Sequence, residues 1–280
     1  MSEDLSLRAL LSSSKLNATD AKILMAHVLE THYQLPRSAL LSRDDMLLNT
    51  EAMADWKALE ARRIRGEPIA YLVGKRGFHN IELHVASGVL IPRPETELLV
   101  EIGLREIKRL NAPARILDLG TGSGAIALAI AHESPTAQVT ATDQSIEALA
   151  IARKNAALLN VASRVVFFQG SWYEALNGNE SFDIILSNPP YIAAQDPHLS
   201  QGDLRFEPVS ALTDHGSGLS CLEKIISSAQ QYLKPNGLLA VEHGFDQSEA
   251  VVALMQSASF HDIQTHQDLG GHYRVASARK

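Results

Sequence analysis

The stretch that decides the fold is Arg115-Ile116-Leu117-Asp118-Leu119-Gly120-Thr121-Gly122-Ser123-Gly124. Its first five residues predict a buried strand, and its glycines predict a tight turn into a helix that begins at Ala125. Glycines also let a ligand approach the backbone, and the first turn of the helix offers free N–H groups to polar or anionic parts of that ligand. A tight turn without a ligand is the alternative, but three glycines in five residues make it the weaker one.

Strands and helices alternate from this stretch onward. Further strands are predicted by apolar runs at 138–142, 165–168, 182–187 and 238–242, and helices between them by residues 145–159 and 218–233. Residues 263–267 and 272–278 flank Asp268-Leu269-Gly270-Gly271 and predict a closing antiparallel hairpin. The pattern predicts an α/β domain, a doubly wound Rossmann-like parallel sheet with this hairpin, which is the shape associated with S-adenosylmethionine (SAM) enzymes.

The residues before this domain predict two smaller parts. Helical spacing of apolar residues predicts an amphipathic helix from Thr19, which can cap it, to about Tyr33, and a second helix that opens at 49–51 and stops at Gly66. Alternation between about 78 and 91 then predicts a β-hairpin, with residues 89–91 as its second strand. We therefore expect a helical domain over 1–75, a β-hairpin linker over 76–92 and the α/β domain over 93–280.

Composition narrows the classes of function. The 280 residues carry 25 Lys and Arg against 32 Asp and Glu, a net charge of −7, and residues 1–75 hold ten of each sign. Such a surface has no general attraction to nucleic-acid phosphates or anionic lipids. The single cysteine, Cys221, cannot form an intramolecular disulfide, so we expect a cytoplasmic protein. No histidine stands in a metal-binding spacing, so we expect no metal site.

Two residues beyond the glycine loop are candidate nucleotide contacts. Asp143 ends the second predicted strand, where a carboxylate can accept hydrogen bonds from both ribose hydroxyls; capping the helix at Ser145 is its competing role. Trp172 follows the third strand and can stack on adenine, although a lone tryptophan is more often a core residue. Gly120, Gly122 and Ala125 also satisfy the dinucleotide fingerprint, so the loop alone leaves NAD and SAM both open.

The tetrapeptide Asn188-Pro189-Pro190-Tyr191 follows the fourth predicted strand directly. In a doubly wound sheet that strand lies beside the first, so this tetrapeptide and the glycine loop should face one crevice. Asn188 offers an amide oxygen, the prolines offer carbonyls without N–H donors, and Tyr191 offers a flat ring. Such a site would hold a planar –NH2 group and aim its nitrogen at an electrophile. Hydride transfer needs no such clamp, so an NAD enzyme is the poorer fit, and a turn with an incidental tyrosine is the remaining alternative.

With these motifs the chain resembles the release factor glutamine methyltransferases, the PrmC/HemK family. The resemblance covers essentially all of the chain and rests on the stretches Gly66-Glu67-Pro68-Ile69-Ala70-Tyr71, Leu90-Ile91-Pro92-Arg93-Pro94-Glu95-Thr96-Glu97, 120–124, 188–191 and Gln201-Gly202-Asp203-Leu204-Arg205-Phe206-Glu207-Pro208. The Asn-Pro-Pro-Tyr motif alone is shared with methyltransferases that act on DNA amino groups. Together with residues 92–97 it is much more specific.

The resemblance implies methyl transfer from SAM, leaving S-adenosylhomocysteine, to the side-chain amide nitrogen (N5) of the glutamine in the Gly-Gly-Gln motif of class 1 peptide chain release factors. The SAM contacts it implies are Gly120, Thr121, Gly122, Ser123, Gly124, Asp143, Trp172 and Asn188. The implied grip on the glutamine consists of Asn188, Pro189, Pro190 and Tyr191, of which Asn188, Pro189 and Tyr191 would be catalytic. Ser171 departs from the acidic residue that many relatives have before the tryptophan.

Three other functions compete with this one. A glutamine of a ribosomal protein is the closest alternative substrate. A DNA or RNA amino group is the second, and it would require flipping a base into the same pocket. The net negative charge of the chain is unsuited to nucleic acid. A binding module that holds SAM without turnover is the third. We expect residues 1–75 to recognise the release factor, and we expect a monomer with no direct nucleic-acid or membrane contact.

Overall fold

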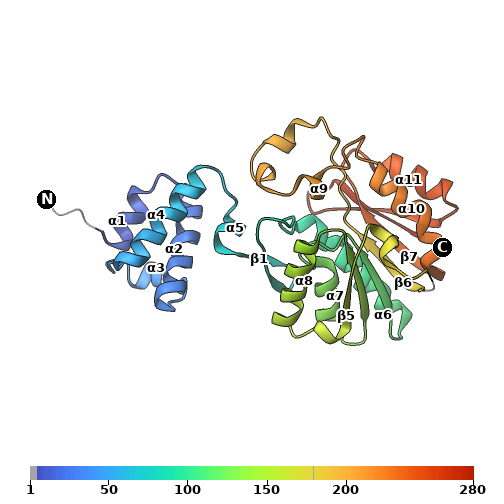
Figure 1. Ribbon diagram of the computed structural model, residues 1–280, viewed down its shortest axis with the longest axis horizontal. Coiled ribbons are helices and arrows are strands. Elements are labelled where there is room, and N and C mark those ends of the chain that lie inside the picture. Colours follow the sequence, from blue (N-terminus) through green and yellow to red (C-terminus); the bar gives the residue numbers. More distant parts are fainter. Residues whose placement is uncertain (1–4, 179) are drawn as a thin grey trace. The chain divides into compact units, whose positions relative to one another are not determined.

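The computed structural model describes residues 5–178 and 180–280, and the chain divides into two compact units (Figure 1). The first unit ends at Gly74 and the second begins at Lys75. No helix among the described residues is long and apolar enough to cross a bilayer.

The first unit is helical. Its helices are α1 (Leu7–Ser13), α2 (Ala18–Tyr33), α3 (Ala39–Ser42), α4 (Thr50–Ile64) and α5 (Ile69–Val73). Its core contains Trp56, only 2% exposed, among leucines and alanines of α2 and α4. The expected cap of α2 is wrong: Asn17, not Thr19, caps it, because Asn17 has extended backbone just before the first helical residue and accepts from the Asp20 N–H at 2.9 Å.

The expected hairpin exists, but its strands lie earlier than predicted. β1 (Lys75–Phe78) pairs antiparallel with β2 (Ile81–His84), with Phe78 opposite Ile81. The predicted second strand at 89–91 is wrong. His79 adopts a left-handed φ of 49°, so the chain reverses in a two-residue turn at 79–80 between the two strands. Ile91 donates its N–H to the side chain of Glu207 instead of to a neighbouring strand.

The second unit contains a seven-stranded sheet. Its strands are β3 (Arg115–Leu119), β4 (Gln138–Asp143), β5 (Val165–Gln169), β6 (Phe182–Ser187), β7 (Leu233–Glu242), β8 (His261–Gln267) and β9 (Tyr273–Arg279). They are ordered β5-β4-β3-β6-β7-β9-β8; β9 runs antiparallel to both β7 and β8, and the other pairs are parallel. The predicted doubly wound sheet, its closing hairpin and the β3–β6 adjacency are confirmed.

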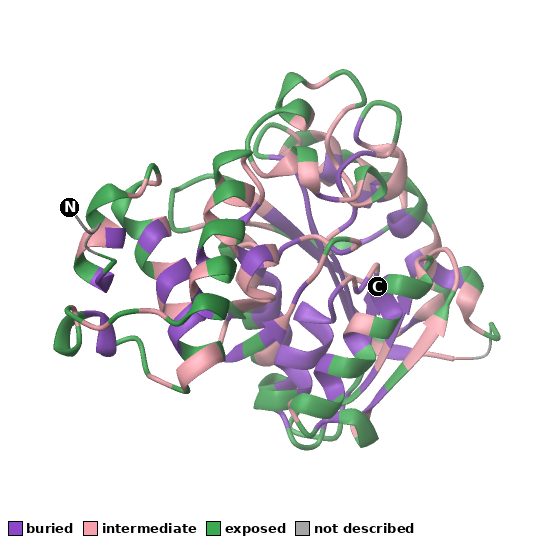
Figure 2. Cartoon of the chain, turned by 60° about the vertical axis from the view of Figure 1, so that its left-hand side comes forward, coloured by how far each residue is buried: buried purple, intermediate pink, exposed green. Residues whose placement is uncertain are grey.

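Helices cover both faces of the sheet. They are α6 (Glu97–Leu110), α7 (Ala125–Glu133), α8 (Ile146–Leu158), α10 (Ser220–Tyr232) and α11 (Ser248–Ser257). The connections also contain the one-turn helix α9 (Val209–Leu212) and the 3₁₀ turns η1 (Pro94–Thr96), η2 (Ala162–Arg164), η3 (Trp172–Ala175), η4 (Pro197–Ser200) and η5 (Leu204–Phe206). Figure 2 shows the central strands buried and the helices exposed on their outer sides. Apolar runs without polar alternation are what a sheet covered on both faces requires.

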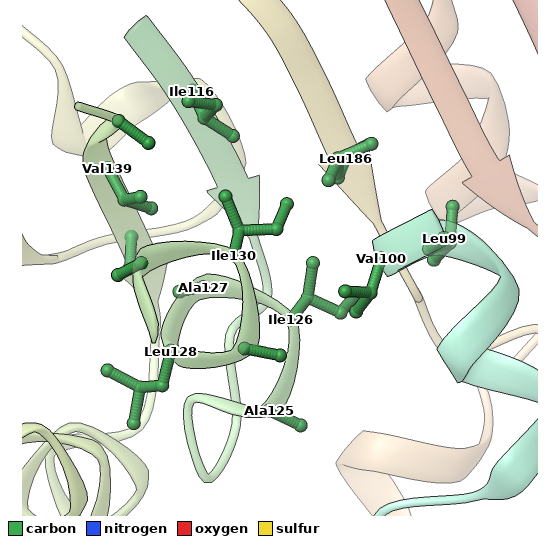
Figure 3. Packing of buried hydrophobic residues seen from close by; sticks show 14 of the residues in the cluster. Leu99, Val100, Ile116, Ala125, Ile126, Ala127, Leu128, Ile130, Val139 and Leu186 are labelled. Atoms are coloured by element: carbon green, nitrogen blue, oxygen red, sulfur yellow. The ribbon is translucent and has the colours of Figure 1, made fainter. Parts of the chain in front are cut away.

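Each strand sends alternate side chains to the two faces. Ile116 joins the core under α6 and α7, while its neighbour Leu117 joins the core under α10 and α11. Figure 3 shows α7 wedged among Ile116, Val139 and Leu186 of three adjacent strands, with Leu99 and Val100 of α6 beside it. This packing fixes α7, and therefore fixes the glycine loop that precedes it.

Candidate active site

A cavity of about 620 Å³ opens where β3, β4 and β6 end. Its lining includes Gly120 and Gly122 of the glycine loop, Asp143 of β4, Trp172, and Asn188 and Pro190 of the tetrapeptide. More of the wall comes from residues 88–90 and from the segment 208–215, with Cys221 and Lys224 of α10. The expected crevice between the glycine loop and the tetrapeptide is therefore present.

The glycine loop is held to the neighbouring strand by its backbone. The N–H groups of Gly120 and Thr121 both donate to the Thr142 carbonyl at 2.9 Å, and the Gly124 N–H donates to the Thr121 carbonyl at 2.8 Å. Gly120, Gly122 and Gly124 have φ values of 71°, 56° and 88°, which residues with a side chain rarely adopt. The glycines are thus required by the turn itself, and Gly124 caps α7.

Asp118 anchors the loop from below. Its Oδ2 accepts from the Thr121 hydroxyl at 2.6 Å and from the Ala127 N–H at 3.2 Å, so one carboxylate joins β3, the loop and α7. Asp118 is fully buried, and burial raises its pKa to about 7 despite these two donors. Within the loop, Thr121 and Ser123 are also buried and are not among the residues that line the cavity.

Asp143 faces the cavity with both of its oxygens fixed. Oδ2 accepts from the Gly122 N–H at 2.8 Å, and Oδ1 accepts from the Ser145 N–H at 2.9 Å. Burial raises the pKa of this carboxyl, while these backbone donors act in the opposite direction. It is Ser145 that caps α8, through its hydroxyl and the Ala148 N–H, so the competing role of Asp143 as the helix cap is wrong.

Trp172 lies over the glycine loop. Its backbone has a left-handed φ of 50°, and a Cβ atom added to Gly120 would lie 3.1 Å from Cζ3 of its ring. The side chain lines the cavity and also packs against the core beneath α10. The indole is therefore partly a core side chain and partly exposed to the cavity, and its stacking on adenine stays a prediction.

Asn188 is oriented by a residue that lies 92 positions earlier in the chain. Its Nδ2 donates to the hydroxyl oxygen of Thr96 at 3.0 Å, which leaves Oδ1 as the acceptor that needs a partner. Thr96 ends the turn η1 and is only 4% exposed. Next to Asn188, the Ser187 hydroxyl donates to the Leu119 carbonyl at 2.7 Å and joins the ends of β6 and β3.

Tyr191 points its hydroxyl into the protein. The hydroxyl donates to Oε1 of Glu242, at the end of β7, at 3.0 Å, and Arg274 Nη2 lies 3.4 Å from the same hydroxyl. Burial and the Glu242 charge raise the pKa of Tyr191, and burial raises the pKa of Glu242 to about 7. Tyr191 and Pro189 are not among the residues that line the cavity. Tyr191 therefore supports the tetrapeptide from behind.

The segment that closes one side of the cavity is anchored by a buried carboxylate. Glu207 accepts from the Arg93 guanidinium and, at 3.1 Å, from the Ile91 N–H. Burial raises the pKa of Glu207, and Arg93 opposes that shift. Pro208, directly after Glu207, lines the cavity. Two stretches singled out in the sequence, 90–97 and 201–208, are therefore joined here by an ion pair.

Sequence reasoning gave no role to four residues that support the site, although three of them lie in the stretches 90–97 and 201–208. Thr96, Glu242, Arg93 and Glu207 act through pairing between distant segments, which no local pattern reveals. One signal was available for Glu242: it ends an apolar run at the carboxyl edge of the sheet, as Asp143 does. Carboxylates whose pKa values are strongly shifted by burial cluster at functional sites, so a carboxylate at this edge is a candidate site residue.

Comparison with known proteins places the chain among methyltransferases. A family model described as a methyltransferase small domain matches residues 96–205, and one described as a PrmC N-terminal domain matches residues 6–74. A release factor glutamine methyltransferase of Burkholderia pseudomallei is 46% identical over 274 residues, which cover 96% of this chain and 94% of that protein. One of Xylella fastidiosa is 48% identical over 268 residues, covering 96% and 95%.

A crystal structure of a methyltransferase from Pyrococcus furiosus has the same fold. Its TM-score is 0.53 at 17% identity, and the match covers 80% of this chain and 98% of that one.

Proposed function

The chain belongs to the release factor glutamine methyltransferase family, and we propose that it transfers a methyl group from SAM to the side-chain amide nitrogen of the glutamine in the Gly-Gly-Gln motif of class 1 release factors. The observation that carries the proposal is the orientation of Asn188, whose Nδ2 is occupied by Thr96 so that Oδ1 remains to accept an N–H group. Asn188 lines the same cavity as Gly120, Gly122 and Asp143.

The cavity fits SAM. Its volume of about 620 Å³ lies in the range of roughly 300–1,000 Å³ typical of small-molecule sites. Asp143 would accept from the ribose hydroxyls, Trp172 would cover the adenine, and the glycine loop at the start of α7 would receive the polar end of the cofactor. When bound, SAM supplies a methyl carbon that bonds to the incoming nitrogen while the carbon–sulfur bond breaks and its electron pair remains on the neutral thioether.

The chain's own contribution is to hold the nucleophile. An amide nitrogen is a poor nucleophile because its lone pair is delocalised. Asn188 Oδ1 and the carbonyl of the adjoining Pro189, which is itself outside the cavity lining, would accept its two N–H bonds, orient it and increase its electron density. Orientation can supply up to about 7–11 kcal/mol in favourable cases. The excess proton can leave to water after transfer, so no general base is required.

Recognition of the whole factor must come from elsewhere, because a single planar amide cannot distinguish one protein from another. Residues 1–74 carry nearly balanced charge, which suits a protein partner better than a phosphate backbone. The proposal therefore assigns release-factor recognition to this unit, in a monomeric cytoplasmic enzyme.

Mass spectrometry of tryptic peptides tests the proposal. The wild-type protein, SAM and a class 1 release factor should yield a Gly-Gly-Gln peptide heavier by one methylene group, and absence of that product would overturn the proposed reaction. Asn188→Ala should lose at least about a hundredfold in kcat while remaining folded, since its interaction is made in the transition state. The matched control is Asn80→Ala, which should leave kcat unchanged. Asn80 lies in the β1–β2 turn, and its side chain is hydrogen-bonded to Glu133.

A further inference from the structure

The β1–β2 hairpin belongs to the core of the second unit, beside the helix that follows the glycine loop. Its apolar residues Phe78, Ile81 and Leu83 are buried and join the same core cluster as α7. β2 packs against both α7 and α8. Residues 75–84 are not part of the cavity lining, but residues 88–90, which soon follow β2, are. The hairpin therefore supports the cavity from outside.

One buried side chain of α8, Asn155, connects this hairpin to the glycine loop. Asn155 is only 1% exposed. Its Oδ1 accepts from the His84 N–H at 2.8 Å, and its Nδ2 donates to the His84 carbonyl at 3.0 Å and to the Ser123 carbonyl at 2.9 Å. All three partners are backbone groups. A single amide group therefore holds both the end of β2 and the last part of the glycine loop.

The bond to Ser123 reaches a carbonyl that lies just outside the hydrogen-bond ladder of α7. That ladder begins one residue later, at the Gly124 carbonyl. The N–H group of Ala127 donates to Asp118 Oδ2 at 3.2 Å. A buried carbonyl without a donor is costly, and Asn155 supplies the donor. The glycine loop is therefore held by two buried side chains, Asp118 from β3 and Asn155 from α8.

These contacts fix two walls of the cavity relative to each other. One wall is the glycine loop, and the other is the segment 88–90, which begins four residues after His84. We propose that Asn155 is a positioning residue for the cofactor, which keeps the glycine loop in register with the segment 88–90 although it does not itself line the cavity. The inference rests on the proposed function and extends the cofactor site to the hairpin, which then does more than connect the two units.

Asn155→Asp is the sharpest substitution, because a carboxylate keeps the size and the acceptor for the His84 N–H but has no donor for the two carbonyls. The glycine loop is then released, and SAM must order it on binding, which lowers the affinity. We expect the Kd for SAM, measured by calorimetry, to rise about tenfold or more, and the KM for SAM to rise with it. At saturating SAM, kcat should stay within about threefold of the wild type, because Asn188 is held by Thr96 and not by the hairpin.

Three further variants separate positioning from stability. Asn155→Ala removes all three bonds and should also weaken SAM binding by about tenfold or more. Asn80→Ala removes another asparagine that holds the hairpin, through Glu133 at the turn, and should leave the Kd for SAM unchanged. Met255→Ala truncates a fully buried residue of α11 outside the cavity lining, so it should lower the melting temperature without changing the Kd.

Hydrogen exchange of the wild-type chain gives a second test that needs no variant. SAM should slow exchange of the backbone amides in the glycine loop, and through Asn155 it should also slow exchange in β2, by about threefold or more. β2 lies outside the cavity lining, so the cofactor cannot protect it by direct contact. The edge strand β8, also outside the lining, is the internal control and should exchange at the same rate with and without SAM.

The outcomes distinguish the inference from the proposed function. A wild-type protein that does not bind SAM would overturn the proposed function and the inference with it. If the wild type binds SAM, a wild-type Kd in folded Asn155→Asp and Asn155→Ala would overturn the inference alone. Unchanged exchange in β2 while SAM protects the glycine loop would do the same. Should the Asn155 variants fail to fold, the exchange measurement on the wild type still decides.

Discussion

The Arg93 guanidinium is paired with the buried carboxylate of Glu207, which lies 114 residues further along the chain. The pair connects the stretch before α6 to the stretch that closes one side of the cavity. Glu207 also accepts from the Ile91 N–H, so its carboxylate holds both the backbone and the Arg93 side chain of the stretch before α6. Pro208, Ser210 and Ala211, which follow Glu207 closely in the chain, line the cavity.

Arg93→Met should therefore weaken cofactor binding. It leaves Glu207 buried without its partner, which typically costs about 3–5 kcal/mol of stability and loosens the cavity wall. We expect affinity for SAM, measured by calorimetry, to fall by about tenfold or more. Lys234→Met is the control, since it also removes a paired cation, bonded to Asp183 away from the cavity. Equal affinity in both variants would show that the pair has no role in the cavity.

Gly122 offers a test of the cavity as the cofactor site. A Cβ atom added there meets nothing within 4 Å, at a left-handed φ of 56°, so Gly122→Ala should cost about 1–2 kcal/mol of stability and place a methyl group in the cavity. Gly178→Ala is the matched control, with φ 79°, open space and no place in the cavity lining. Calorimetry should show weaker SAM binding in Gly122→Ala only. NAD binding to the wild type in place of SAM would contradict the assignment.

Two buried carboxyl groups should contribute less to stability as the pH rises towards neutral. Asp118 and Glu242 have ordinary pKa values of 3.8 and 4.5, and burial raises both to about 7 in the folded protein. Between these values the folded state binds more protons than the unfolded state, so the free energy of unfolding decreases until about pH 7 and then levels off for these two groups.

Asp118→Asn should remove part of that pH dependence. Urea unfolding at pH 5 and pH 8 would show a smaller difference than in the wild type, by an amount of the order of a few kcal/mol. Asp45→Asn, which changes an exposed carboxylate in the first unit, should leave the difference unchanged. An unaltered difference in Asp118→Asn would mean that this carboxyl titrates normally.

Removing residues 1–74 tests their assignment to recognition. A chain that begins at Lys75 keeps the cavity and its lining, so SAM binding should persist. Methylation of whole release factor should fall much more than methylation of a short Gly-Gly-Gln peptide, because the remote binding energy helps to position the glutamine. Equal losses on the two substrates, or salt-sensitive duplex binding by the first unit, would contradict the assignment.

The sheet could be predicted from sequence because its signals are local. Runs such as 182–187 are too apolar to face water on either side, and the glycines after Leu119 permit a turn that other residues disfavour. The linker register was not predictable in this way. Residues 89–91 are as apolar as a strand, but Val89 and Ile91 are buried without strand pairing. Only the left-handed turn at His79 shows which segments pair.

In the candidate site, too, local signals were predictable and contacts between distant segments were not. Asn188, Asp143 and Trp172 follow strand ends, so the topology alone predicts that they share a crevice. The partners that orient them were hidden, because a threonine in a turn has no signature until β6 brings Asn188 beside it. Tyr191 was predicted to offer its ring to the substrate, and its hydroxyl is bonded to Glu242 instead of facing the cavity.

The edge strand β8 affects how the protein behaves at high concentration. An edge strand presents unpaired backbone groups on which another chain can add, the first step of fibrous aggregation. β8 is polar along most of its length, none of its residues is fully buried, and its pairing with β9 is irregular at two places. A polar, irregular edge is a poor template for strand addition. The β8–β9 hairpin therefore disfavours aggregation through this edge of the sheet.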